Sequence, residues 1–126
     1  MIQFEVYIKY DSGIIFDIIH NLEWLVGPDR DINLNDANAW INNLNINSNG
    51  WRIPTDNEVA TLLEKYEISK FFMTTGRYVW IMDKVGEKPY ACVMLLQTRY
   101  KNILVVDEQD TFYNRVFAVR HLQQAK

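Results

Sequence analysis

Aromatic, arginine and asparagine side chains gather in two polar connections late in the chain, at residues 98–102 and 107–114. Tyr and Arg are enriched among residues that dominate binding energies, and recognition residues collect on loops that a rigid sheet supports. The pattern therefore predicts a binding surface, and its expected residues are Arg99, Tyr100, Asn102, Tyr113 and Asn114. The plainer alternative is that Arg99 and Tyr100 form only the tip of a hairpin.

Cys92 is the only cysteine of the chain and therefore its only candidate thiol nucleophile or copper ligand. It lies in the apolar run Ala91–Leu95, where a cysteine behaves as a small hydrophobic residue. With no second cysteine, the chain cannot form an internal disulfide or a Cys-based zinc site. We predict that Cys92 is a buried, unreactive residue.

Two further patterns are weak candidates for metal binding. Oxygen side chains occupy alternate positions of Asp29–Asp36, as at the start of a calcium loop. Such a loop needs Gly at its sixth position and Glu at its twelfth, where this chain has Leu34 and Trp40, so a polar turn and helix cap fits better. His20 and His121 have no carboxylate at ligand spacing, and we interpret them as surface residues unless the fold brings them together. No metal or cofactor is predicted.

The composition limits the classes of function. The 126 residues, 48% of them hydrophobic, suit one domain spanning 1–126. A net charge of -3 without a basic run excludes an electrostatic footprint for nucleic acid. No uncharged apolar run approaches the roughly 20 residues that span a bilayer, and no basic then apolar leader opens the chain. We expect a soluble protein, cytoplasmic by default, although a secreted or cell-surface domain would look the same once excised.

The central stretch Gly50–Glu58 has the pattern of a helix start with an apolar anchor in front. Thr55 and Glu58 have the spacing of a capping box, in which each satisfies a backbone N–H near the other. Trp51 and Ile53 should fall on one buried face. Capping and packing account for the whole stretch, so we expect the binding surface to lie elsewhere.

Apolar periodicity predicts two helices. Their buried stripes are Ala37, Trp40, Ile41 and Leu44 in the first helix, and Val59, Leu62, Leu63 and Tyr66 in the second. Asn35 or Asp36 is the expected N-cap of the first helix, and the second should end near Glu67.

Alternating or continuous apolar runs predict the strands. These are Phe4–Tyr10, with Phe4, Val6, Ile8 and Tyr10 on the apolar face, followed by Ile14–Ile18, Leu22–Val26, Tyr78–Met82, Pro89–Gln97, Ile103–Val106 and Arg115–Leu122. His20 and Asn21 should form a hairpin turn. Residues Val116–Val119 are apolar on both faces, which favours a central strand that is covered on both sides. The order of elements predicts an α+β fold, with two helices packed on an antiparallel β-sheet.

The order of these motifs resembles the Lcl C-terminal-domain-like family, a bacterial group of mostly unknown function. The resemblance covers roughly residues 14–122 and rests on Leu22-Glu23-Trp24-Leu25, the Gly27-Pro28-Asp29 loop, Ala37 and Trp40, Gly50-Trp51-Arg52-Ile53-Pro54-Thr55 with Glu58, Tyr78-Val79-Trp80, and Val119-Arg120. It implies a C-type-lectin-like fold, related in architecture to sulfatase-modifying factors. The chain lacks the late cysteine of many members, since Phe117–Arg120 stands there, and it lacks the Glu-Pro-Asn and Trp-Asn-Asp sugar signatures. Neither a disulfide-stabilised form nor calcium-dependent sugar binding is expected.

These observations favour a noncatalytic lectin-like module that binds a protein, glycan or small molecule. One alternative is an enzyme related to sulfatase-modifying factors, which would need Cys92 exposed beside a second thiol or a metal. Another is a structural or oligomerising domain of a larger assembly.

Overall fold

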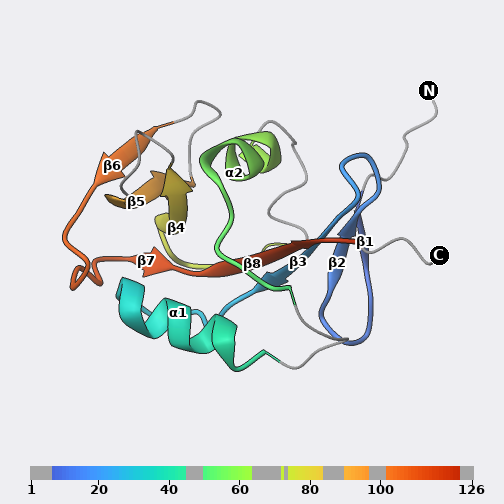
Figure 1. Ribbon diagram of the computed structural model, residues 1–126, viewed down its shortest axis with the longest axis horizontal. Coiled ribbons are helices and arrows are strands. Elements are labelled where there is room, and N and C mark those ends of the chain that lie inside the picture. Colours follow the sequence, from blue (N-terminus) through green and yellow to red (C-terminus); the bar gives the residue numbers. More distant parts are fainter. Residues whose placement is uncertain are drawn as a thin grey trace.

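The computed structural model describes residues 7–44, 50–63, 72, 74–83, 90–96 and 102–122. They form the predicted α+β fold, with two helices and two β-sheets (Figure 1). The elements are β1 (Tyr7–Lys9), β2 (Ile15–Asp17), β3 (Leu22–Val26), α1 (Leu34–Asn42), α2 (Asp56–Leu63), β4 (Tyr78–Asp83), β5 (Tyr90–Leu95), β6 (Ile103–Val105), β7 (Asn114–Arg115) and β8 (Phe117–His121).

The first sheet has the strand order β1-β2-β3-β8, and every neighbouring pair is antiparallel. β2 and β3 form the predicted hairpin, with residues 18–21 as the connection. Asp17 holds this turn, because its Oδ1 accepts hydrogen bonds from the backbone N–H groups of Ile19 and His20, each at 3.1 Å. Asn21 has a left-handed φ of 56°, which asparagine tolerates better than most residues. The turn is therefore longer than the two residues that the sequence predicts.

The second sheet has the order β6-β5-β4-β7 and contains one parallel pair, β4 with β7. The predicted single strand over Arg115–Leu122 is wrong, because the chain divides into β7 and β8, which belong to different sheets. Val116 lies between them, and its carbonyl accepts a hydrogen bond from the Gly27 N–H at 2.9 Å. A Cβ at Gly27 would overlap Val116, so glycine permits the close approach at which the chain passes between sheets.

The stretch 116–119 is buried on both faces as predicted, but the predicted central position is wrong, because β8 is the last strand in the order of its sheet. Successive strand side chains point to opposite faces, and here they enter two different clusters of buried residues. Phe117 and Val119 belong to the cluster under α2, whereas Val116 and Ala118 belong to the cluster under α1. The two helices accordingly lie on opposite sides of β8 (Figure 1).

The N-cap of α1 lies two to three residues earlier than predicted. The N-cap is Asn33, whose Oδ1 accepts a hydrogen bond from the Asp36 N–H at 2.8 Å, so the prediction of Asn35 or Asp36 is wrong. Leu34 belongs to the helix, and its N–H donates to the Glu108 carbonyl at 3.1 Å, a distant partner that local spacing does not reveal. Among the described residues, no helix is long and apolar enough to cross a membrane.

The buried face of β1 is the opposite of the predicted one: Tyr7 faces the core, and Ile8 faces solvent. Tyr7 is 1% exposed, whereas Ile8 is 41% exposed. The Tyr7 ring packs edge-on against Phe72, with ring centroids 6.0 Å apart, and this aromatic contact decides the face. Phe4 and Val6 lie outside the described residues.

Candidate functional site

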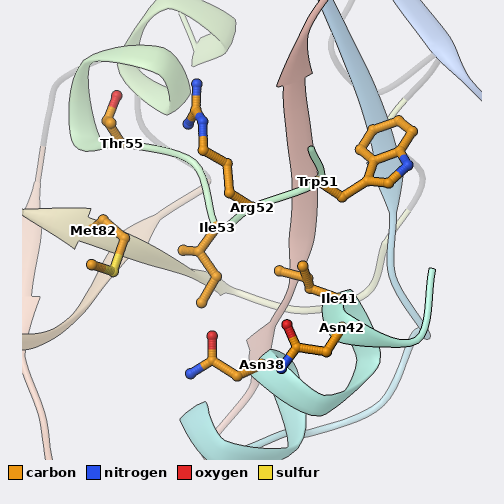
Figure 2. Close-up of a pocket in the computed structure, with 8 residues that line it drawn as sticks. All are labelled: Asn38, Ile41, Asn42, Trp51, Arg52, Ile53, Thr55 and Met82. Carbon is orange, nitrogen blue, oxygen red and sulfur yellow. The ribbon is translucent and has the colours of Figure 1, made fainter. Parts of the chain in front are cut away.

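A pocket of about 550 Å³ opens between the C-terminal half of α1 and the stretch 51–55 (Figure 2). Its lining combines amide, apolar, guanidinium and hydroxyl side chains, from Asn38, Ile41, Asn42, Trp51, Arg52, Ile53, Thr55 and Met82. The pocket therefore adjoins the central stretch, which the sequence analysis explains by capping and packing alone.

The wall formed by the stretch 51–55 is fixed to both sheets. Arg52 exchanges two backbone hydrogen bonds of 3.0 Å with Val119 of β8. Two residues later, the Pro54 carbonyl accepts a hydrogen bond from the Met82 N–H of β4 at 2.9 Å. Because the stretch is bonded to one sheet at each end, the backbone of this wall is held in place.

The same wall is fastened to α2 by the predicted capping box, which the structure confirms. The Glu58 N–H donates to the Thr55 Oγ1 at 3.2 Å, and the Thr55 N–H donates to the Glu58 Oε1 at 2.8 Å. Arg52 adds a bidentate ion pair with the Glu58 carboxylate, through Nη1 at 2.7 Å and Nη2 at 2.8 Å. Burial alone would raise the pKa of Glu58, but the hydrogen bonds from Arg52 and Thr55 together bring that pKa below its usual range. The charge of Arg52 is thus already neutralised.

The apolar part of the pocket comes from three elements. Ile41 of α1 and Ile53 are buried in the cluster under α1, and Met82 of β4 is 40% exposed at the edge of the pocket. Trp51 is only 9% exposed, and the guanidinium of Arg120 lies 4.2 Å from the centre of its ring. Figure 2 shows the Trp51 ring directed away from the space between Asn38 and Met82. The indole therefore contributes to the wall and not to an open stacking surface.

Asn38 and Asn42 supply the exposed polar groups of the pocket. They stand four residues apart on α1, so their side chains lie on the same face of the helix. Within the described part of the chain, no hydrogen bond is found for either carboxamide. By contrast, the neighbouring Asn43 side chain donates to the Ala39 carbonyl at 2.9 Å and Asn33 caps the helix. The carboxamides of Asn38 and Asn42 therefore face the pocket with donors and acceptors available for a ligand.

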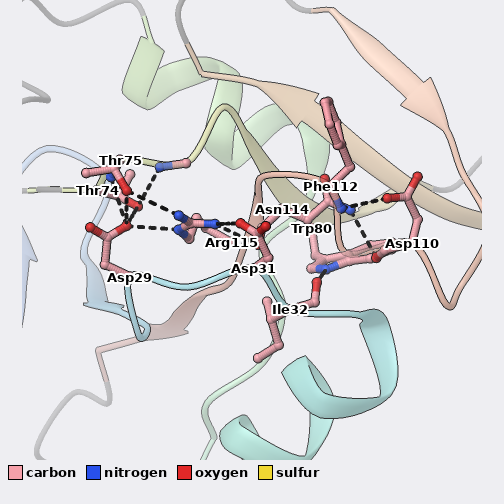
Figure 3. Close-up of polar contacts among 11 residues, drawn as sticks. Asp29, Asp31, Ile32, Thr74, Thr75, Trp80, Asp110, Phe112, Asn114 and Arg115 are labelled. Atoms are coloured by element: carbon pink, nitrogen blue, oxygen red, sulfur yellow. Dashed lines mark hydrogen bonds and ion pairs between the residues drawn. The ribbon is translucent and has the colours of Figure 1, made fainter.

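A second polar cluster, around Arg115, joins three separated parts of the chain (Figure 3). Arg115 is 5% exposed; its Nε donates to Asp29 Oδ1 at 2.9 Å and its Nη1 to Asp31 Oδ1 at 2.7 Å. Asp29 Oδ1 also accepts hydrogen bonds from the Thr75 N–H at 2.8 Å and from the hydroxyls of Thr74 and Thr75 at 2.9 and 3.0 Å. Arg115 first, and then the Thr75 backbone, hold the pKa of Asp29 well below its usual range.

The Arg115 cluster is a structural joint, because each charged group already has its partner. A Cβ at Gly76 would overlap the Arg115 side chain, so the passage of this arginine also depends on a glycine. The cluster is not predicted from the sequence, in which Asp29–Asp36 has the pattern of a polar turn and helix cap. An arginine followed directly by a fully apolar run is a signal that could have indicated a buried ion pair.

Of the five residues predicted to form a late-loop binding surface, the structure describes Asn102, Tyr113 and Asn114. Arg99 and Tyr100 lie outside the described residues. Asn102 and Tyr113 are exposed, but Asn114 is only 2% exposed in β7, and its Nδ2 donates to the Asp110 carbonyl at 3.2 Å. The placement of Asn114 on an exposed loop is therefore wrong, because the carbonyl of Asp110 satisfies its amide in the turn that precedes β7.

Among the predicted binding residues that the structure describes, Tyr113 is the one with unusual backbone geometry. Its φ is 54°, a left-handed conformation that costs a non-glycine residue energy. Its carbonyl accepts hydrogen bonds from the N–H groups of Arg77 and Tyr78, at 3.0 and 3.2 Å. The Arg77 guanidinium lies 4.9 Å from the centre of the Tyr113 ring, and the exposed ring of Phe112 packs edge-on against it. This exposed aromatic corner is a second surface, outside the lining of the pocket.

The cysteine and histidine candidates for catalysis and metal binding lie in β5 and at one end of the first sheet. Cys92 is 1% exposed, as predicted for a residue of an apolar run. His20 Nδ1 lies 2.9 Å from Asp17 Oδ2, and His121 pairs in register with Leu22 at the same end of the sheet. Within the described ranges, no group of three or more His, Cys, Asp or Glu side chains is placed to hold a metal ion.

Comparison of the chain with models of protein families gives no match, and comparison with curated proteins gives none either. The assignment of a function therefore depends on the geometry of the pocket.

Proposed function

We propose that this domain is a noncatalytic binding module with a C-type-lectin-like fold, as its resemblance to the Lcl C-terminal-domain-like family implies, and that its ligand occupies the pocket between α1 and residues 51–55. The proposal rests on one observation: a fixed, partly apolar hollow lies beside the carboxamides of Asn38 and Asn42, for which no hydrogen bond is found within the described residues. Ligand sites are typically concave and mostly apolar, with a few placed polar groups that orient the ligand.

The chemistry of the lining favours binding over catalysis. A catalytic site needs a nucleophile or base, a group that orients it, and a stabiliser of developing charge. The lining offers amides, a hydroxyl used in the capping box, and an arginine paired with Glu58. Cys92, the candidate thiol nucleophile, is buried in the cluster under α2. The alternative of an enzyme related to sulfatase-modifying factors therefore has less support.

The test is a thermal-denaturation screen of the wild-type domain against three probe sets: neutral oligosaccharides, a pool of random heptapeptides, and free amino acids with nucleosides. A ligand that binds only the native state raises the melting temperature by mass action. Asn38→Trp fills the pocket from an exposed helical position, and Asn35→Trp is the matched control on α1 outside the pocket. We expect at least one set to stabilise the wild type and Asn35→Trp but not Asn38→Trp. No stabilisation by any set, or equal stabilisation of all three proteins, would refute the proposal.

A further inference from the structure

The inference concerns which class of ligand the pocket takes, and it rests on the proposed function. We infer that the pocket binds an extended peptide segment of a partner protein, and that the carboxamides of Asn38 and Asn42 hold the main chain of that segment.

The chemistry of the two carboxamides matches a peptide backbone. Each primary amide carries donors and an acceptor, as a peptide group presents an N–H and a C=O. Residues four apart on a helix are separated by about 6 Å along its axis. In an extended chain, residues two apart present their N–H and C=O groups to the same side and are separated by about 6.6 Å. Asn38 and Asn42 therefore have the spacing to bond two successive peptide units on one edge of the segment.

The apolar part of the hollow suits a side chain of such a segment. Side chains of an extended segment alternate in direction, so one that lies between the two held units can enter the space bounded by Ile41, Ile53 and Met82. Methionine has three flexible torsions and a polarisable sulfur, and it adapts to side chains of different shape. Met82 is 40% exposed at this edge, in a strand whose backbone is fixed by its pairing with Pro54.

The remaining groups disfavour anions and sugars. Arg52 is held by both carboxylate oxygens of Glu58, so a phosphate or carboxylate ligand would have to compete with an ion pair already formed. Sugar rings commonly stack on an open aromatic face, but Trp51 is 9% exposed and Arg120 lies over its ring. A neutral ligand recognised through hydrogen bonds is left, and a peptide main chain is the neutral ligand that the two amides fit.

The experiment begins with selection of a phage-displayed random heptapeptide library on the immobilised wild-type domain. The selected peptide is synthesised with a fluorophore and in versions methylated at single backbone nitrogens, and affinities are measured by fluorescence anisotropy. We expect N-methylation at two positions, two residues apart, to weaken binding about tenfold each. Asn38→Ala and Asn42→Ala should each weaken it about tenfold, whereas Asn35→Ala should leave it unchanged. Each harmful methyl group should lose its effect in one of the two variants, because the hydrogen bond that it breaks is already absent.

The outcomes separate this inference from the proposed function. If peptides bind in a way that Asn38→Trp blocks, but N-methylation and the alanine variants have no effect, the backbone role of the asparagines is wrong and the binding module stands. If oligosaccharides alone stabilise the domain through the pocket, the peptide inference is wrong and the binding module again stands. If no probe of any class is sensitive to Asn38→Trp, both fail.

Discussion

Replacement of Glu58 by alanine should destabilise the domain by about 2 kcal/mol and loosen the pocket wall. The Glu58 carboxylate accepts three hydrogen bonds, from Arg52 Nη1 at 2.7 Å, Arg52 Nη2 at 2.8 Å and the Thr55 N–H at 2.8 Å. The side chain of Glu58 is 15% exposed and that of Arg52 is 37% exposed. Solvent therefore screens the ion pair, which limits its contribution to about 1 kcal/mol. Loss of the capping-box bond adds about 1 kcal/mol.

The stabilisation that Glu58 provides should depend on pH. The pKa of Glu58 is lower in the folded protein than its usual range, so the carboxylate stabilises the fold above the unfolded-state pKa of about 4.3. That stabilisation is lost as the pH falls through the folded-state pKa. The difference in unfolding free energy between wild type and Glu58→Ala should therefore be full at pH 7 and should shrink progressively below about pH 4.

Urea unfolding of wild type, Glu58→Ala and Glu108→Ala at pH 7 and pH 3 measures this difference. Glu108 is exposed, so its replacement should change the unfolding free energy by no more than about 0.5 kcal/mol. A loss for Glu58→Ala as small as that of the control, or one that stays constant between pH 7 and pH 3, would refute the assignment of the carboxylate as the charged link between the wall and α2.

Three further changes test the frame around the pocket. Arg115→Ala should lower the melting temperature clearly more than Arg30→Ala, because Arg115 is buried with two carboxylate partners and Arg30 is exposed. Equal effects of the two substitutions would contradict the structural role of the Arg115 cluster. Cys92 should not react with Ellman's reagent in native buffer and should react fully in denaturant, and rapid native labelling would restore the enzyme alternative. Trp51→Ala should cost about 3 kcal/mol by chemical denaturation and Thr55→Ala about 1 kcal/mol, so the reverse order would show that Trp51 is not the anchor of the wall.

Local patterns in the sequence predicted the features that depend on near neighbours. The capping box of Thr55 and Glu58, the hairpin of β2 and β3, and the buried stripe of α1 all follow from residues within a few positions of one another. The prediction for residues 115–122 was wrong because the break at Val116 depends on Gly27, almost ninety positions earlier by the printed numbering. Burial of Tyr7 depends on Phe72 in the same way.

The candidate site could not be predicted from the sequence, because it too depends on long-range contacts. Each half of the pocket has an ordinary local explanation, since Asn38 and Asn42 are polar residues of an amphipathic helix and residues 51–55 precede a capped helix. Their approach to one another depends on the backbone hydrogen bonds that Arg52 and Pro54 make to Val119 of β8 and Met82 of β4. Those long-range bonds bring the wall to the asparagine face of α1.

The most direct test of the account is a two-dimensional amide NMR titration with the probe that most raises the melting temperature. The account predicts that the side-chain NH₂ signals of Asn38 and Asn42 and the backbone signal of Ile53 shift with the same saturation curve, while those of Asn102 and Tyr113 stay in place. Saturable shifts confined to Asn102 and Tyr113 would contradict it and would place the binding surface on the late loops.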